Sequence, residues 1–201
     1  GVKQVRFEVV EARSASGLGF DPALGSKGGN ATCPFCGTVA DDDYIRRLGM
    51  ANQTTRQLMA VVCTAPGSRG KRYLPGDSVE RLIPDDDSAT LRIEELCRAT
   101  GLTVPNEPIN PLRPSPWTRG ASGVTRHGMT TWGDLFTPRQ MLCLLSFAVA
   151  VRAVQQEMRE VSYTEGHVRA TAATLALAVD KVAALNSVLT RWKQDAELCV
   201  D

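Results

Sequence analysis

The C-terminal third of the chain carries the clearest hydrophobic pattern, an apolar residue at every third or fourth position. Thr137, Pro138 and Gln140 have the order of a capped helix start, with Thr as the N-cap and Gln reaching back to it. The sequence breaks at 163–166, and a second stretch with the same spacing predicts a helix of about eight turns. Two long amphipathic helices with a short connection pack antiparallel, so we expect a helical hairpin over 137–199. The apolar positions are Leu144, Phe147, Val151, Val154, Met158 and Val161, then Val168, Ala172, Leu175, Val179, Val182, Leu189 and Trp192.

The N-terminal part alternates between apolar and polar residues over short distances, which indicates strands. Residues 2–12 place Val5, Phe7 and Val9 on one face and predict a half-buried strand. Residues 57–64 and 71–74 flank a turn at 65–70 and predict a β-hairpin. The stretch 13–31 is rich in Gly and Ser without periodicity, so we expect a loop there.

Two acidic clusters, at 41–43 and 85–87, each precede a short amphipathic stretch that a glycine closes, Gly49 or Gly101. Acidic residues before a helix and Gly after it predict two short helices. The pattern as a whole predicts an α+β fold in one domain. We expect a β-rich part with a cysteine knuckle over 1–78, a short helix within 79–101, an extended proline-rich connection over 102–136 and the helical hairpin.

Composition narrows the class of protein. The 201 residues hold 23 Lys plus Arg against 22 Asp plus Glu, so the chain lacks the strongly basic balance of a small self-sufficient DNA binder. No apolar run approaches the roughly 18–20 residues that a membrane span needs, and no signal peptide opens the chain. Six cysteines, mostly scattered, indicate a reducing compartment. Because the chain starts at Gly1 without Met, we expect an internal piece of a larger cytoplasmic protein.

Cys33 and Cys36 form the most specific local motif, Cys33-Pro34-Phe35-Cys36-Gly37. Two thiolates two residues apart on a tight turn grip one side of a tetrahedral Zn²⁺. A structural zinc takes four ligands, and the sequence holds no second pair, so we interpret the motif as half of a zinc site. A redox dithiol and an inert turn are the alternatives.

A basic cluster lies at the predicted hairpin turn, where Arg69, Lys71 and Arg72 follow closely on one another. A protruding basic tip suits contacts to DNA phosphates, although solvated basic clusters of no function are common. Asn186 falls within the apolar stripe of the second predicted helix. We expect it either to fix the helix register by a buried hydrogen bond or to face a functional surface.

Several segments, in the same order, resemble the adenine-specific DNA methylases that contain a zinc ribbon, a family often found near phage-defence genes. The most specific segment ends in Leu135-Phe136-Thr137-Pro138-Arg139-Gln140. The matching segments are 5–9, 31–37, 44–46, 57–62, 73–75, 128–140, 178–181 and 185–192.

The resemblance implies that this chain is an insert between two halves of a methyltransferase that moves a methyl group from S-adenosylmethionine to adenine in DNA. The glycine-rich cofactor motif would precede the insert and the Asp-Pro-Pro-Tyr motif would follow it. The nearest approaches here, at 21–24 and 110–113, lack the second Pro and the aromatic residue that hold a flipped adenine. We therefore expect no catalytic or S-adenosylmethionine-binding residues in this chain.

The resemblance also implies zinc, with the other cysteine pair upstream, and as partners the rest of the methylase chain, DNA and defence-system subunits. The insert would help to recognise DNA or to position the catalytic halves. A scaffold that docks a partner through the helical hairpin, without touching DNA, is the alternative. A free-standing zinc-ribbon regulator is a third, which the missing ligands and initiator Met disfavour.

Overall fold

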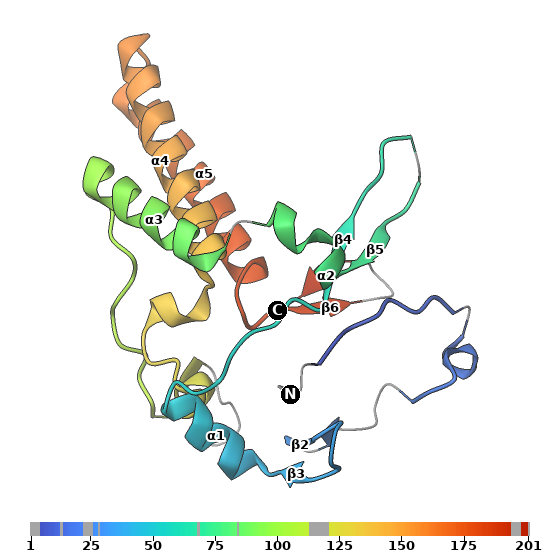
Figure 1. The fold of residues 1–201 in the computed structure, drawn as a ribbon. Coiled ribbons are helices and arrows are strands. Elements are labelled where there is room, and N and C mark those ends of the chain that lie inside the picture. Colours follow the sequence, from blue (N-terminus) through green and yellow to red (C-terminus); the bar gives the residue numbers. More distant parts are fainter. Residues whose placement is uncertain are drawn as a thin grey trace. The chain divides into compact units, whose positions relative to one another are not determined.

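Helices and short antiparallel strands share the chain, and the longest helices come last (Figure 1). The computed structural model describes residues 5–12, 14–21, 26–27, 29–67, 69–83, 85–112, 121–193 and 198–200. The predicted α+β class is confirmed. The chain divides into two compact units, the first made of residues 1–83 and 109–130 and the second of 84–108 and 131–201.

The first unit contains a three-stranded sheet of order β1-β2-β3, a separate β4–β5 hairpin and short helices. Its elements are η1 (Ala15–Leu18), β1 (Ser26–Lys27), β2 (Asn30–Thr32), β3 (Val39–Ala40), α1 (Asp42–Met50), β4 (Ala60–Cys63), β5 (Arg72–Pro75), α2 (Gly76–Val79), η2 (Glu80–Leu82) and η3 (Ala121–His127). The 13–31 stretch, predicted to be a loop, therefore includes a 3-10 turn and two short strands.

The β4–β5 hairpin confirms the sequence prediction, since Ala60 pairs with Pro75 and Cys63 with Arg72 in an antiparallel ladder. The predicted strand at 2–12 was wrong for its described residues, 5–12, which belong to no strand. Their side chains do alternate between half-buried and exposed up to Val10. However, Val5 O accepts a hydrogen bond from the side-chain amide of Gln57, at 2.6 Å, and a side chain cannot extend a backbone ladder.

Helix α1 begins as its sequence predicts, because the Asp41 carboxylate accepts a hydrogen bond from the Tyr44 N–H at 2.7 Å. It does not end at Gly49 but continues to Met50. Gly49 has another role, since a Cβ there would lie 2.7 Å from the carbonyl oxygen of His127. Only glycine lets α1 approach the backbone of η3 so closely.

The second unit is mainly helical, and α4 lies side by side with α5 and with α3 (Figure 1). The four-residue break between α4 and α5 makes them the antiparallel hairpin that the spacing predicts. The elements are α3 (Asp86–Thr100), η4 (Trp132–Leu135), α4 (Pro138–Glu160), α5 (Glu165–Leu185), β6 (Arg191–Lys193) and β7 (Leu198–Val200). Of the predicted extended connection, 102–136, residues 113–120 lie outside the described part, and η3 and η4 occupy much of the rest.

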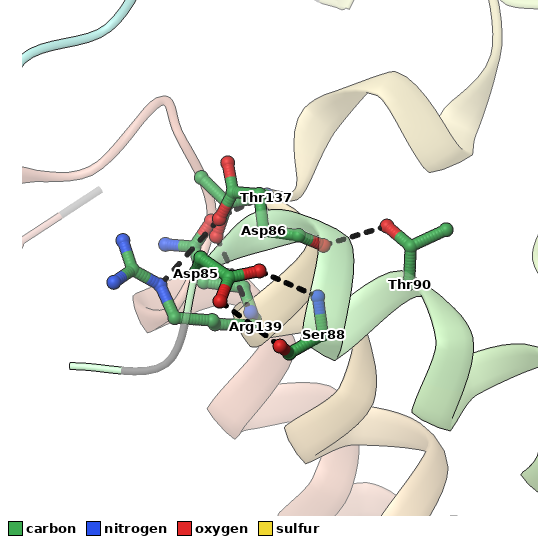
Figure 2. Close-up of polar contacts among 7 residues, drawn as sticks. Asp85, Asp86, Ser88, Thr90, Thr137 and Arg139 are labelled. Atoms are coloured by element: carbon green, nitrogen blue, oxygen red, sulfur yellow. Dashed lines mark hydrogen bonds and ion pairs between the residues drawn. The ribbon is translucent and has the colours of Figure 1, made fainter.

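The first turns of α3 and α4 are capped and joined to each other (Figure 2). Asp85 accepts from the Ser88 N–H at 2.7 Å, and this bond, followed by the Ser88 hydroxyl, holds the pKa of Asp85 below its ordinary value. Thr137 and Gln140 form the predicted capping box. The Arg139 guanidinium lies 3.7 Å from the Asp86 carboxylate and so connects the two helix starts.

Helix α5 is shorter than predicted, because the hairpin assigned to 137–199 ends at Leu185. Asn186 is the C-cap residue, so its predicted place within the helical stripe was wrong. The chain turns there because Val188 N–H donates to Leu135 O at 2.8 Å, while the Thr190 hydroxyl donates to Ser187 O at 2.7 Å. These bonds replace the helical ones, and the chain continues into the β6–β7 pair.

The core of the second unit lies between α3 and α4. Ile93, Met141 and Leu145 are buried there against one another, and Gly101, left-handed with φ 68, closes α3 as predicted. Partly buried side chains surround this cluster: Leu96, Cys97, Leu102, Phe136 and Leu142.

Helix α4 is also long and apolar enough to span a membrane, with a mean hydropathy of 1.3 over its apolar window. The expectation that no apolar run approaches this length was wrong for α4. Core helices of globular proteins meet the same criterion, so length and composition do not assign it to a membrane. Only 11% of the window is buried, and many of its other apolar residues are half-buried.

Replacing Leu145 with Ala should lower the free energy of unfolding by about 2–5 kcal/mol, because a buried leucine leaves a cavity. Leu145 is 6% exposed and Leu177, on α5, is 71% exposed. Leu177→Ala is therefore the matched control, with an expected change within about 0.5 kcal/mol. Urea denaturation followed by circular dichroism measures both, and equal effects would contradict the assigned core.

Candidate functional site

The cysteine motif forms a tight turn between β2 and β3. Cys33 N–H donates to Thr38 O at 2.8 Å, and Gly37 N–H donates back to Cys33 O at 2.9 Å. Gly37 has φ 71, in the left-handed region that favours glycine. These backbone bonds hold the turn that carries both sulfur atoms, with Cys33 half-buried and Cys36 exposed.

The surroundings of Cys36 favour its thiolate. Its sulfur lies 3.3 Å from the hydroxyl oxygen of Thr38. Hydrogen bonds from the Thr38 hydroxyl, then from the Thr38 N–H and the Cys33 thiol, hold the pKa of Cys36 below its ordinary value. The thiolate is the form that binds metals, so this turn suits two ligands of a tetrahedral zinc site.

No further potential metal ligand joins Cys33 and Cys36 among the residues that the structure describes. Within that part of the chain, no group of three or more His, Cys, Asp or Glu residues is placed to hold a metal ion. Cys63, Cys97, Cys143 and Cys199 are free thiols on other elements. In the described part of the chain, Cys33 and Cys36 are therefore the two cysteines close enough in sequence to serve as a pair of ligands.

A cleft of about 590 Å³ lies beside the cysteine turn, between it and the first turns of α1. Its lining includes Pro34, Val39, Asp41, Tyr44 and Arg47. The Tyr44 side chain is 46% exposed, and the Arg47 guanidinium lies over its ring at 5.8 Å from the centroid. An aromatic ring and a cation therefore share one open cavity.

The basic cluster lies on the β4–β5 hairpin, whose connecting loop extends beyond the paired strands (Figure 1). Arg69 and Lys71 belong to the loop and Arg72 opens β5, and all three are exposed. Residues 60–75 hold these three basic residues and no acidic one. The structure thus keeps the predicted cluster together on one tip.

Helix α1 carries two arginines, Arg46 and Arg47, which have different partners. Arg46 bonds to the carboxylates of Asp42 and Asp43, the second at 3.3 Å. Arg47 instead contacts Tyr44. Sequence reasoning missed Tyr44, although helix spacing places Tyr44 and Arg47 one turn apart.

An apolar groove of about 260 Å³ runs between α4 and α5 in the second unit. Phe147, Val151 and Val154 line it from α4, and Leu175, Val179 and Val182 from α5. These side chains come from the predicted apolar stripes, but sequence spacing gave no indication that a groove would stay open between them. No charged residue lines it.

Comparisons with protein-family models, with curated proteins and with solved structures found no match to this chain.

Replacing Thr38 with Val should raise the pKa of Cys36, because the largest of the stabilising hydrogen bonds is lost while the backbone bonds remain. The thiolate fraction then falls at any pH below the ordinary thiol pKa, and alkylation of Cys36 by iodoacetamide slows. Mass spectrometry of timed samples from pH 6 to 9 gives the rate. Cys143, also exposed, is the internal reference. An unchanged rate profile at Cys36 would contradict the assigned bond.

Proposed function

We propose that this chain is a non-catalytic internal segment of an S-adenosylmethionine-dependent, adenine-specific DNA methyltransferase, and that it aids DNA recognition. The resemblance over most of the chain is one support. The observation that carries the proposal is the hairpin tip, where Arg69, Lys71 and Arg72 are exposed without an acidic residue between 60 and 75. A basic projection of this kind suits DNA phosphates.

Zinc fits the proposal through the cysteine turn. In the first unit, Ile109 is the one buried hydrophobic side chain among the described residues. A small unit with so little core is usually stapled by a metal or a disulfide. Cys33 and Cys36 would supply two ligands of that zinc, and a second pair, upstream in the larger protein, would complete it.

The chemistry would reside in the rest of the methylase chain, the first partner that we propose. The glycine-rich cofactor motif and the Asp-Pro-Pro-Tyr motif are both missing from this sequence. Defence-system subunits are further proposed partners, on the resemblance alone, and the proposed location is the cytoplasm.

A scaffold function is the second candidate, and the groove between α4 and α5 favours it. The groove is apolar and without charged residues, and α4, which lines one side of it, has an apolar window that is only 11% buried. Such a surface suits packing against another helix. In this alternative, the helical hairpin braces the methylase core of the larger protein, and the chain does not touch DNA.

Replacing Arg69, Lys71 and Arg72 together with Ala separates the two candidates. If the tip contacts phosphates, duplex affinity falls, and the slope of log K against log salt flattens by about 0.9 for each lost contact. Exposed charges contribute little to stability, so the melting temperature should hold. Fluorescence anisotropy with a labelled duplex at several salt concentrations gives both quantities.

The control variant replaces three exposed basic residues of the second unit with Ala: Arg98, Arg169 and Lys181. It lowers the net charge by the same three units as the variant of the β4–β5 tip. Its affinity and slope should stay closer to those of the unmodified chain. If the triple substitution at the β4–β5 tip leaves the slope of log K against log salt unaltered, the scaffold function is favoured.

Zinc binding tests the metal half of the proposal. We expect the 201-residue chain to hold less than one zinc, because two thiolates leave half of the coordination sphere to water. Extending the chain upstream to include a second pair should give one tightly held zinc, lost in the Cys33→Ser, Cys36→Ser variant but kept in Cys143→Ser. Zinc that survives the double substitution would contradict the assignment of ligands.

A further inference from the structure

The cleft beside the cysteine turn joins three properties that a nucleobase site requires. It has room, at about 590 Å³, and it exposes one aromatic ring, Tyr44. It also presents a guanidinium, since Arg47 lines the same cavity and lies 5.8 Å from the Tyr44 ring centroid. Aromatic rings and guanidinium planes are the surfaces on which unstacked bases of single strands lie.

Hydrogen bonds around the cleft fix the backbone on both of its sides. Tyr44 N–H donates to the Asp41 carboxylate at the helix start, so the ring sits on the first, capped turn of α1. Arg47 follows one turn later, on the same face. The opposite wall is the cysteine turn, which the bonds between Cys33 and Thr38 and between Gly37 and Cys33 fix.

The charges around the cleft favour stacking over electrostatic attraction. Three aspartates precede or open α1, but Asp42 and Asp43 both bond to Arg46. Asp41 and Arg47 remain as the charged residues that line the cleft, and they balance each other. A duplex, whose bases are already stacked and whose affinity comes mainly from phosphates, gains little here.

We infer that this cleft binds a base of single-stranded nucleic acid, stacked on Tyr44, with Arg47 extending the stacking surface and meeting the adjacent phosphate. The inference rests on the proposed function and specifies it: the hairpin tip meets duplex phosphates, and the cleft holds an unpaired base. The two sites use different residues, so each can fail alone.

The test uses the whole chain and a fluorescein-labelled oligothymidylate of about 12 nucleotides, within the usual site size of single-strand binders. Tyr44→Ala should weaken binding about tenfold, as the loss of one stacked base does elsewhere, and leave the salt slope unchanged. Tyr44→Phe, which keeps the ring, should bind like the unmodified chain. Arg47→Gln should flatten the slope by about 0.7, the value for one single-strand phosphate.

Tyr163→Ala is the matched control, because Tyr163 is also exposed, at 51%, but belongs to the second unit and has its ring beside His167. It should bind like the unmodified chain. Equal affinities of Tyr44→Ala and the unmodified chain, or no binding of oligothymidylate at all, would overturn the inference.

If the triple variant of the β4–β5 tip still loses duplex affinity in that case, the proposed function stands without the cleft. If the Tyr44 variants behave as expected but the variant of the β4–β5 tip keeps its duplex affinity, base binding by the cleft is supported and DNA binding by the tip is contradicted.

Discussion

The uneven supply of buried hydrophobic side chains is the constraint on which the rest of this structure depends. In the second unit, Ile93, Met141 and Leu145 pack between α3 and α4, and Val168 is fully buried on α5. In the first unit, as far as it is described, Ile109 alone is buried to this degree. Hydrophobic burial can therefore hold the helices together, but it cannot by itself hold the strands and loops.

The first unit relies instead on directional and close backbone contacts. Gly49 lets α1 approach η3, and Asp41 caps α1. The cysteine turn is closed by bonds from Cys33 and Gly37. Such contacts fix local geometry at a modest gain in free energy, about 0.5–1.5 kcal/mol per hydrogen bond. A zinc ion that joined this turn to a second cysteine pair would add the missing crosslink, which is why the metal and the larger protein belong to one proposal.

Sequence reasoning succeeded where a local signal determined the structure. The capping box of Thr137 and Gln140, the left-handed Gly101 and the β4–β5 hairpin each depend on residues close in the chain. It failed where tertiary partners decided. The alternation from Val5 onward looks like a strand, but no strand accompanies the described residues, and α5 stops at Asn186 because Val188 bonds to Leu135, far away in the sequence.

The same distinction applies to the candidate sites. The sequence alone predicted two of the candidate sites, because the residues of each follow closely on one another: Cys33 with Cys36, and the basic residues within 69–72. The cleft was not predicted, although its lining also lies close in sequence, within 31–47, because residue spacing does not show whether a cavity stays open between the cysteine turn and α1. The apolar groove was hidden for a related reason, since a stripe at helical spacing does not reveal whether its partner covers it fully.

Mapping of nucleic-acid contacts by nuclear magnetic resonance tests the central claim most directly, namely that the first unit meets nucleic acid and the helical hairpin does not. With assigned backbone amides of the ¹⁵N-labelled chain, duplex DNA should shift the signals of Arg69 to Arg72. Oligothymidylate should shift those of Tyr44 to Arg47. The amides of α4 and α5 should stay in place. Shifts confined to groove residues such as Val151 and Val179, or no shifts at all, would contradict the account.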